Sequence, residues 1–314
     1  MKHLLFLVTM LILVGCREGR ESRVRIAGKT MGTTWSVVLR ESPADHLESQ
    51  VQRRLDELEA LLSHWRSDSE VSVFNGLARA APTSMKVSAE VAAVVGAGLR
   101  WSQRTDGAFN VALGHANGFG PAEDHASAAP GRSAHELLRL EDRMLTSLKA
   151  GVGLDLSALG KGYAVDEIAR LLEQEGVHQY LVEIGGEIRS RGDGWRIGLE
   201  EPQPGPTRMY RAVELRAEGV SVATSGNYRL FEGAPFSPAA LRSHLVSNQA
   251  EKRFRSVTVF APTAMEADAL ATSLFVLPRD QARSLGRSEG VRVVFLDNGV
   301  EGIVQEIVEP SVHP

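Results

Sequence analysis

The chain has 314 residues, 43% of them apolar and 24% charged, with a formal net charge of −4. That length is enough to bury a sizeable core in one large domain or two small ones. A protein that binds nucleic acid electrostatically carries a basic excess, so the acidic balance argues against a nucleic-acid partner.

An apolar run near the N-terminus predicts export. The opening MKHLLFLVTMLILVGC places Lys2 before an apolar run over residues 4–14, and Cys16, the only cysteine in the chain, follows Gly15. The run is too short to span a bilayer but fits the apolar region of a secretory signal, with an ordinary buried segment as the alternative. The residues LVGC also resemble the lipobox of bacterial lipoproteins, in which the cysteine is lipidated.

These features predict how the chain is divided and where it is found. We expect a signal peptide over residues 1–15, a polar tether over residues 16–23 and one domain over residues 24–314. A lipidated Cys16, with palmitate among its acyl chains, would anchor the domain to a bacterial membrane in the cell envelope, facing the periplasm or the exterior.

Periodicity and turn signals predict a mixture of strands and helices in the domain. Expected in the first half are two strands joined by a turn at Met31-Gly32, a helix over 47–62 with Ser42-Pro43 as its start signal, a polar loop over 64–75, a helix from Ser88 to about Gln103, an irregular stretch from 105, and a surface loop over about 121–136. Expected in the second half are strands before Asp155, a helix after Lys161 ending near Gly176, strands broken at Gly185-Gly186, more strands between about 210 and 260, a helix capped by Thr263 and Glu266 and closed by Pro278, and a hairpin turning at Asn298-Gly299. This order predicts an α+β fold.

One motif of this series suggests a phosphate site. DLSALGKGYAVDEIARLLEQEG, residues 155–176, places Lys161 between two glycines where a helix begins. The free amides and the dipole of a helix N-terminus favour an anion, although a solvated lysine would fit the same pattern. A Walker A loop is excluded, because Gly162 stands where that loop needs Ser or Thr and position 155 is not glycine. The dinucleotide fingerprint G-x-G-x-x-G is absent from this turn as well.

A second pair of residues suggests a metal. Asp268 and Thr272 lie four positions apart on a predicted helix, so both side chains project from one face. A carboxylate and a hydroxyl, with backbone carbonyls, form a hard-oxygen set that suits Mg²⁺ bound together with phosphates. An aspartate and a threonine four positions apart occur by chance in most proteins, so this spacing alone indicates no function.

Six segments, in order, resemble the ApbE-type FAD:protein FMN transferases. They are MGTTW (31–35), DGAFN (106–110), DLSALGKGYAVDEIARLLEQEGVHQYLVEIGGEIRSRG (155–192), VATSGNY (222–228), SH (243–244) and EADALATSL (266–274). The resemblance covers about residues 24–308. It implies a T-fold-like α+β architecture with mixed or antiparallel sheets and flanking helices. It also implies an activity, in which FAD is cleaved at its pyrophosphate, FMN is esterified to a threonine (or serine) hydroxyl of another protein, and AMP leaves.

The same resemblance assigns roles to individual residues. Contacts to the flavin nucleotide would come from Met31, Trp65, Ala108, Phe109, Asn110, Asp155, Lys161 and Val246. Mg²⁺ would be held by the backbone carbonyl of Ala158 with Asp268 and Thr272. Trp65 stands where many relatives have tyrosine, which keeps a stacking surface. His244 would be the base for the acceptor hydroxyl, because a positioned base assists a nucleophile of such high pKa.

Two features limit these assignments. In relatives a D-P-x-T-G turn comes after the histidine that matches His244, whereas this chain continues HLVSNQAEKRF. The other histidines in polar stretches, His64, His115, His125 and His135, are expected to be solvated.

Two other functions remain open at this stage. Water as the acceptor would make the protein an FAD pyrophosphatase, and a lost base would make it a non-enzymatic, membrane-tethered flavin-binding lipoprotein. If the chain is a transferase, its partners are FAD and an acceptor protein with a target threonine, of the membrane-bound or exported redox class.

Overall fold

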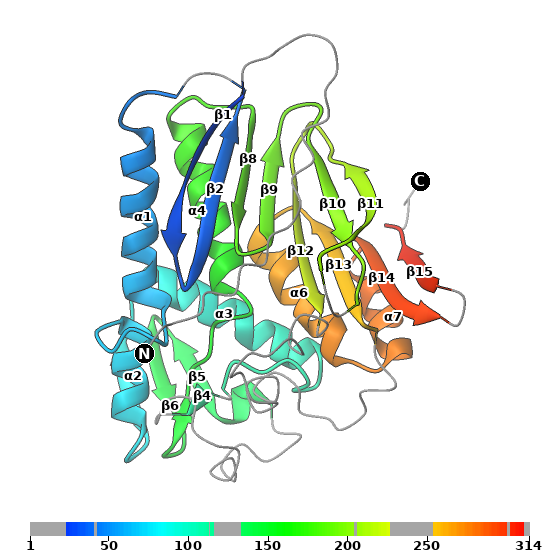
Figure 1. Cartoon of the computed structure of the whole chain (residues 1–314). Coiled ribbons are helices and arrows are strands. Elements are labelled where there is room, and N and C mark those ends of the chain that lie inside the picture. The colour runs from blue at the N-terminus through cyan, green and yellow to red at the C-terminus, as the bar shows by residue number, and fades with distance from the viewer. Residues whose placement is uncertain are drawn as a thin grey trace.

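The computed structural model describes residues 23–40, 43–112, 114–115, 133–203, 206–226, 254–299 and 302–310. Cys16, His244 and Val246 therefore lie outside the described residues, as do the predicted signal peptide and the loop after His244. In the described part, a large twisted sheet is flanked by helices, with a smaller group of helices and short strands at one end of it (Figure 1).

The large sheet has eight strands in the order β1-β2-β8-β9-β12-β13-β14-β15, and every neighbouring pair is antiparallel. Strands from the beginning, the middle and the end of the chain lie side by side in chain order, so one sheet joins distant parts of the described sequence. The strands are β1 (Val24–Thr30), β2 (Thr33–Leu39), β8 (Tyr180–Ile184), β9 (Glu187–Arg191), β12 (Val220–Gly226), β13 (Ser256–Ala261), β14 (Arg292–Gly299) and β15 (Gly302–Val308).

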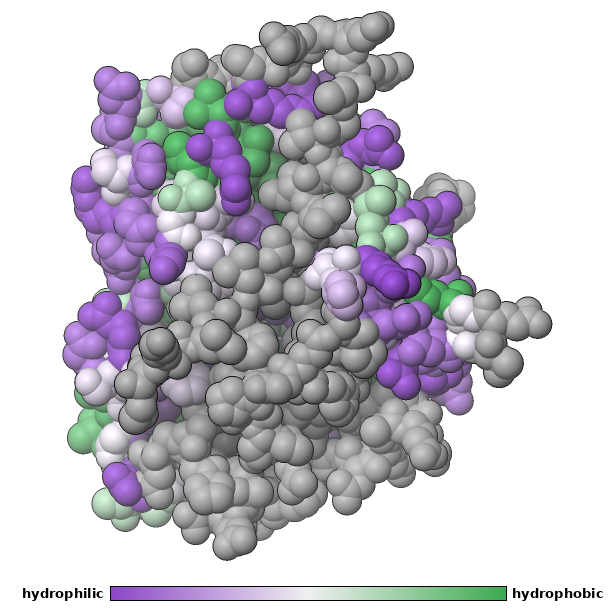
Figure 2. Space-filling view, viewed as in Figure 1, coloured by the Kyte–Doolittle hydropathy of each residue, from purple (hydrophilic) through white to green (hydrophobic). Residues whose placement is uncertain are grey.

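Helices cover one face of this sheet and a hairpin covers the other. Val37 and Val182 pack with residues of α1 (Leu47–Leu62) and α4 (Gly160–Gln174), whereas their neighbours Val38 and Leu181 pack against the hairpin β10 (Arg196–Glu200)–β11 (Met209–Glu214). This is the period of two expected of a strand buried on both faces. Polar residues cover the outer side of α1 (Figure 2).

The remaining elements form the second part of the core. Helices α2, α3 and α6 contribute buried residues to it, together with β13 and β14. The elements are α2 (Glu70–Ala78), α3 (Ala89–Arg104), α6 (Ala264–Val276), α7 (Arg279–Ser288), a 3₁₀ turn (Ala134–Glu136), the sheet β3 (Thr83–Lys86)–β6 (Met144–Ser147)–β5 (Leu138–Glu141) and the pair β4 (Gly114–His115)–β7 (Val152–Gly153).

The α+β class with antiparallel sheets is confirmed, and most predicted elements are present. Four expectations were wrong. The stretch 64–75 is not all loop, because Ser69 caps α2 through its side chain and Val71, Phe74 and Ala78 give that helix a buried face. Helix α1 begins after His46 rather than at Ser42-Pro43.

The other two errors concern chain reversals. Gly299 pairs with Gly302, so the last hairpin turns two residues beyond Asn298-Gly299. At the end of the predicted surface loop, Ser133 and Ala134 are buried, because Ser102 Oγ accepts a hydrogen bond from the Ala134 amide at 2.9 Å.

Close packing of α4 on α6 fixes the position of both helices. Asp166 of α4 accepts hydrogen bonds from the Ala264 and Met265 amides, at 2.8 and 2.9 Å, and so caps α6 from a neighbouring helix. One turn away, a β-carbon on Gly162 would lie 2.4 Å from the Ala264 carbonyl oxygen. Only glycine permits this approach, since a backbone atom cannot give way as a flexible side chain can.

Replacing Gly162 by alanine should therefore destabilise the protein. We expect Gly162→Ala to lower the free energy of unfolding by about 1–3 kcal/mol, because the helices must separate to accommodate the methyl group. Urea unfolding followed by circular dichroism measures the change. Gly160→Ala is the matched control in the same helical turn, because nothing lies within 4 Å of its β-carbon position. Equal stability of the two variants would contradict this account.

Candidate active site

The first turn of α4 places Lys161 beside two buried carboxylates. Its Nζ lies 2.7 Å from Glu187 Oε1 of β9 and 4.0 Å from Asp268 Oδ2 of α6. The neighbouring Gly162 amide donates a hydrogen bond to Asp268 Oδ2 at 3.2 Å. The predicted phosphate lysine and the predicted metal carboxylate therefore share one location, although they come from distant parts of the sequence.

The charges at this location are strongly coupled. Burial lowers the pKa of Lys161, but Asp268 and then Glu187 raise it by more, so the ammonium group stays charged. The pKa of Glu187 is raised to about 8, because burial outweighs the attraction of Lys161 and Asp268 adds a like charge. Glu187 Oε2 is buried without a hydrogen-bond partner among the described residues. With both acids ionised, negative charge exceeds positive charge here, which suits a bound cation.

The donor set fits Mg²⁺. Asp268 is 4% exposed, and one turn later on α6 the Thr272 hydroxyl lies 3.1 Å from Ser225 Oγ. In a regular helix the Gly162 amide would bond the carbonyl of Ala158, but here it donates to Asp268. A carboxylate, a hydroxyl and a carbonyl are hard oxygens of the kind Mg²⁺ binds together with substrate phosphates. Among the described residues, no group of three or more His, Cys, Asp or Glu side chains is arranged to hold a metal ion.

Asp155 connects the predicted flavin residues to the start of α4. Its backbone amide donates to the Val111 carbonyl at 2.9 Å, which places residues 108–110 next to it. Its Oδ1 accepts a hydrogen bond from the Ser157 amide at 2.9 Å. Phe109 is 1% exposed and its ring belongs to the core, so this residue can face a nucleotide only through its backbone.

Met31 lies in the tight turn between β1 and β2. Its φ is 47°, in the left-handed region, and its amide donates to Glu59 Oε2 at 3.0 Å. Such a conformation costs a non-glycine residue of the order of 1 kcal/mol and is often found at functional positions. Gly185 lets the start of β2 lie close to Lys161. A β-carbon added at position 185 would lie 2.9 Å from Thr33 Cγ2 and 3.2 Å from Lys161 Cδ.

His64 is not solvated as predicted. Its side chain is 13% exposed, and its Nδ1 lies 3.9 Å from Asp155 Oδ1. Its ring lies against that of Trp65, with centroids 4.8 Å apart and planes at 43°, while Trp65 itself is 63% exposed. The local sequence carries no signal for the contact with Asp155, because it joins segments about ninety positions apart. His135 is exposed, as expected.

The structure thus brings most of the described site residues together around residues 155–162. They are Trp65, Ala108, Phe109, Asn110, Asp155, Ala158, Lys161, Asp268 and Thr272. Met31 lies in the β1–β2 turn, where its amide donates to Glu59. His244 and Val246 lie outside the described residues, and their roles, like the individual roles of the others, stay predictions.

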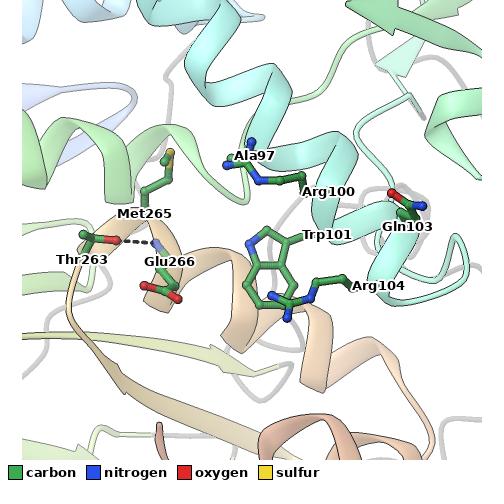
Figure 3. A pocket seen from close by; sticks show the side chains of 8 residues that line it. All are labelled: Ala97, Arg100, Trp101, Gln103, Arg104, Thr263, Met265 and Glu266. Atoms are coloured by element: carbon green, nitrogen blue, oxygen red, sulfur yellow. Dashed lines mark hydrogen bonds between the residues drawn. The ribbon is translucent and has the colours of Figure 1, made fainter. Parts of the chain in front are cut away.

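A separate hollow of about 490 Å³ lies between the end of α3 and the first turn of α6 (Figure 3). The first amides of α6 are not free to bind a phosphate there. The Ala264 and Met265 amides donate to Asp166, and the Glu266 amide donates to Thr263 Oγ1 at 3.2 Å. None of the predicted site residues lines the hollow. Its lining residues are Ala97, Arg100, Trp101, Gln103, Arg104, Thr263, Met265 and Glu266.

The raised pKa of Glu187 predicts a pH dependence of stability. The folded protein keeps this proton up to about pH 8, whereas the unfolded chain releases it near the ordinary value of 4.5. The folded state binds more protons in that window, so its stability should fall as pH rises through it. As pH rises from about 5 to about 8, the free energy of unfolding of metal-free Glu187→Gln should increase by at least about 1 kcal/mol relative to that of the parent. Urea unfolding at both pH values measures this, and replacing the exposed Glu48 by Gln should give no such change.

Comparison with known proteins agrees with this geometry. Residues 31–295 match the ApbE family. The chain is 34% identical to the FAD:protein FMN transferase of Salmonella typhimurium, over 94% of this chain and 92% of that protein. It is 32% identical to the protein of the same name from Escherichia coli K12, over 92% and 90% of the two chains.

Two solved structures share its fold. The flavin transferase ApbE of Vibrio cholerae gives a TM-score of 0.77 at 29% identity, covering 91% of this chain and 97% of that one. The apo form of the flavinyl transferase ApbE of Pseudomonas stutzeri gives 0.74 at 30% identity, covering 93% and 96%. As the sequence motifs predicted, the chain belongs to the ApbE family.

Proposed function

We propose that this chain transfers FMN from FAD to a threonine or serine hydroxyl of an acceptor protein, with Mg²⁺, and releases AMP. The observation that supports it most is the position of Lys161, 4.0 Å from Asp268 at the start of α4. This arrangement suits a pyrophosphate. The helix N-terminus and the lysine favour its negative charge, and the carboxylate can hold a divalent cation beside it. Relatives at 34% and 32% identity are named FAD:protein FMN transferase.

The proposed reaction exchanges the phosphoanhydride bond of FAD for a phosphoester bond to the acceptor. The acceptor oxygen bonds to the phosphorus of the FMN half, the bond to the bridging pyrophosphate oxygen breaks, and AMP leaves with that oxygen. The hydroxyl proton passes to a base, for which His244 is the candidate. Mg²⁺ would neutralise charge on the phosphate oxygens. Lys161 would hold the pyrophosphate in place, and Asp155 would orient the flavin nucleotide.

The proposal also includes a location. With a lipidated Cys16 the protein would be anchored to a bacterial membrane in the cell envelope, with a membrane-bound or exported redox protein as its acceptor. Among the described residues, no helix is long and apolar enough to cross a membrane. Anchoring by acyl chains would need no such helix.

Release of AMP from FAD distinguishes the proposed activity from its alternatives. Purified protein with FAD and Mg²⁺ should release AMP only when an acceptor carrying the target threonine is present, and the acceptor should gain a covalent FMN. Release without an acceptor would identify a pyrophosphatase. Stable binding of FAD without release of AMP, whether or not the acceptor is present, would identify a flavin-binding protein.

Asp268→Asn should abolish Mg²⁺-dependent transfer without unfolding the protein. The amide keeps the shape and an acceptor for the Gly162 amide but loses the charge that binds the metal, so we expect a loss of at least about 10²-fold in rate. Rates of AMP release and thermal unfolding measure the two effects.

Glu266→Gln is the control for this variant. Glu266 is on the same helix but lines the hollow beside α3, outside the proposed metal site. It should keep the parental rate. Near-normal activity of Asp268→Asn would make Asp268 a structural residue and would remove the basis of the metal assignment.

Intact-mass analysis tests the anchor. Protein extracted from membranes should begin at Cys16 and carry the mass of acyl chains, because one chain alone binds weakly and stable anchoring needs more. A soluble product that still begins at Met1 would contradict the anchoring.

A further inference from the structure

His64 contacts two residues that the proposed function places around FAD. Its Nδ1 lies 3.9 Å from Asp155 Oδ1, and its ring lies against the indole of Trp65. The imidazole is 13% exposed and the indole 63% exposed, so the histidine lies beneath an aromatic surface that faces solvent.

The backbone around His64 is held by hydrogen bonds on both sides. Ser63, which ends α1, accepts from the Trp65 and Arg66 amides through its Oγ, at 3.2 and 3.3 Å. Its carbonyl accepts from the hydroxyls of Ser69, the cap of α2, and of Ser72 at 3.3 Å. The histidine is therefore placed by the ends of two helices, which limits the positions its ring can take.

Asp155 is held from two directions. The Ser157 amide donates to its Oδ1 at 2.9 Å, and the His64 imidazole faces the same oxygen. A separation of 3.9 Å is an electrostatic contact rather than a hydrogen bond, and catalytic-site contacts of this kind tighten when a ligand binds. At 3% exposure the carboxylate has little water to orient it, so its neighbours determine its plane.

We infer that His64 is a positioning residue of the FAD site, which aligns the Asp155 carboxylate and supports the Trp65 ring for the incoming nucleotide. The inference rests on the proposed function, because it takes FAD as the ligand. It concerns FAD affinity and assigns His64 no part in bond breaking. No local pattern in the sequence indicates this role.

Binding of FAD tests the inference apart from turnover. With Mg²⁺ but without acceptor, where the proposed transfer consumes no FAD, titration by flavin fluorescence should show that His64→Ala binds FAD about tenfold more weakly than the parent. His64→Gln, whose amide can reach the carboxylate, should recover part of the loss. With Mg²⁺, acceptor and saturating FAD, kcat should stay within about threefold, since the lost interaction is one of binding.

Two comparisons separate positioning from a general loss of structure. His46→Ala is the matched control, since His46 also faces a carboxylate, Glu175 at 3.3 Å, but is exposed on the surface. It should bind FAD as the parent does. In a background of Asp155→Asn, His64→Ala should add less than a further twofold loss, because residues that act together are not additive.

Three outcomes would overturn the inference. Parental affinity in both His64 variants would do so and would leave the proposed function intact. An equal loss in the parental and Asp155→Asn backgrounds would show that His64 acts independently of Asp155. Failure of the parent itself to bind FAD would remove the proposed function together with the inference.

Discussion

The close contact between α4 and α6 determines where the candidate chemistry is located. Asp166 bonds the first two amides of α6, and Gly162, one turn earlier on α4, lets the helix backbones touch. Because the two helices run in opposite directions, the next turn of α6 brings Asp268 back to the Gly162 amide. Lys161 is thereby placed beside Asp268 by backbone packing, with little freedom for either residue to move. A phosphate site built on such a contact is preorganised before any ligand arrives.

That contact also concentrates charge in a buried place. One ammonium group, that of Lys161, faces the two buried acids Glu187 and Asp268. Burial, and then the like charge of Asp268, raises the pKa of Glu187. A divalent cation would favour the ionised form of Glu187 and offset the negative charge of the two acids, and a pyrophosphate would in turn need both the cation and the lysine. In the proposed function, Mg²⁺ and FAD are therefore bound together, each making the site more favourable for the other.

Local signals in the sequence predicted much of the fold. The strand pair around Met31-Gly32, the Ser88 cap of α3, the Thr263 cap of α6 and the left-handed Gly176 each depend on a few neighbouring residues. The sequence did not predict helix α2, because the polar residues 64–70 lead into its short apolar run, although Ser69 is a regular cap. The pairing of Gly299 with Gly302 was misplaced by two residues, since an Asn-Gly pair is a strong turn signal wherever it lies.

The site itself could be predicted only where a motif carried it. Lys161 stood out because its glycines are adjacent in sequence, whereas the contact of His64 with Asp155 depends on how two distant segments pack. Residues 155–162 join both halves of the site, because Asp155 bonds the 108–110 region through Val111 while Gly162 and Lys161 meet α6. In the proposed function this segment must satisfy flavin contacts, a helix start and a helix–helix contact at once, so few sequences are acceptable there. This physical constraint explains why the most specific motif of the chain lies there.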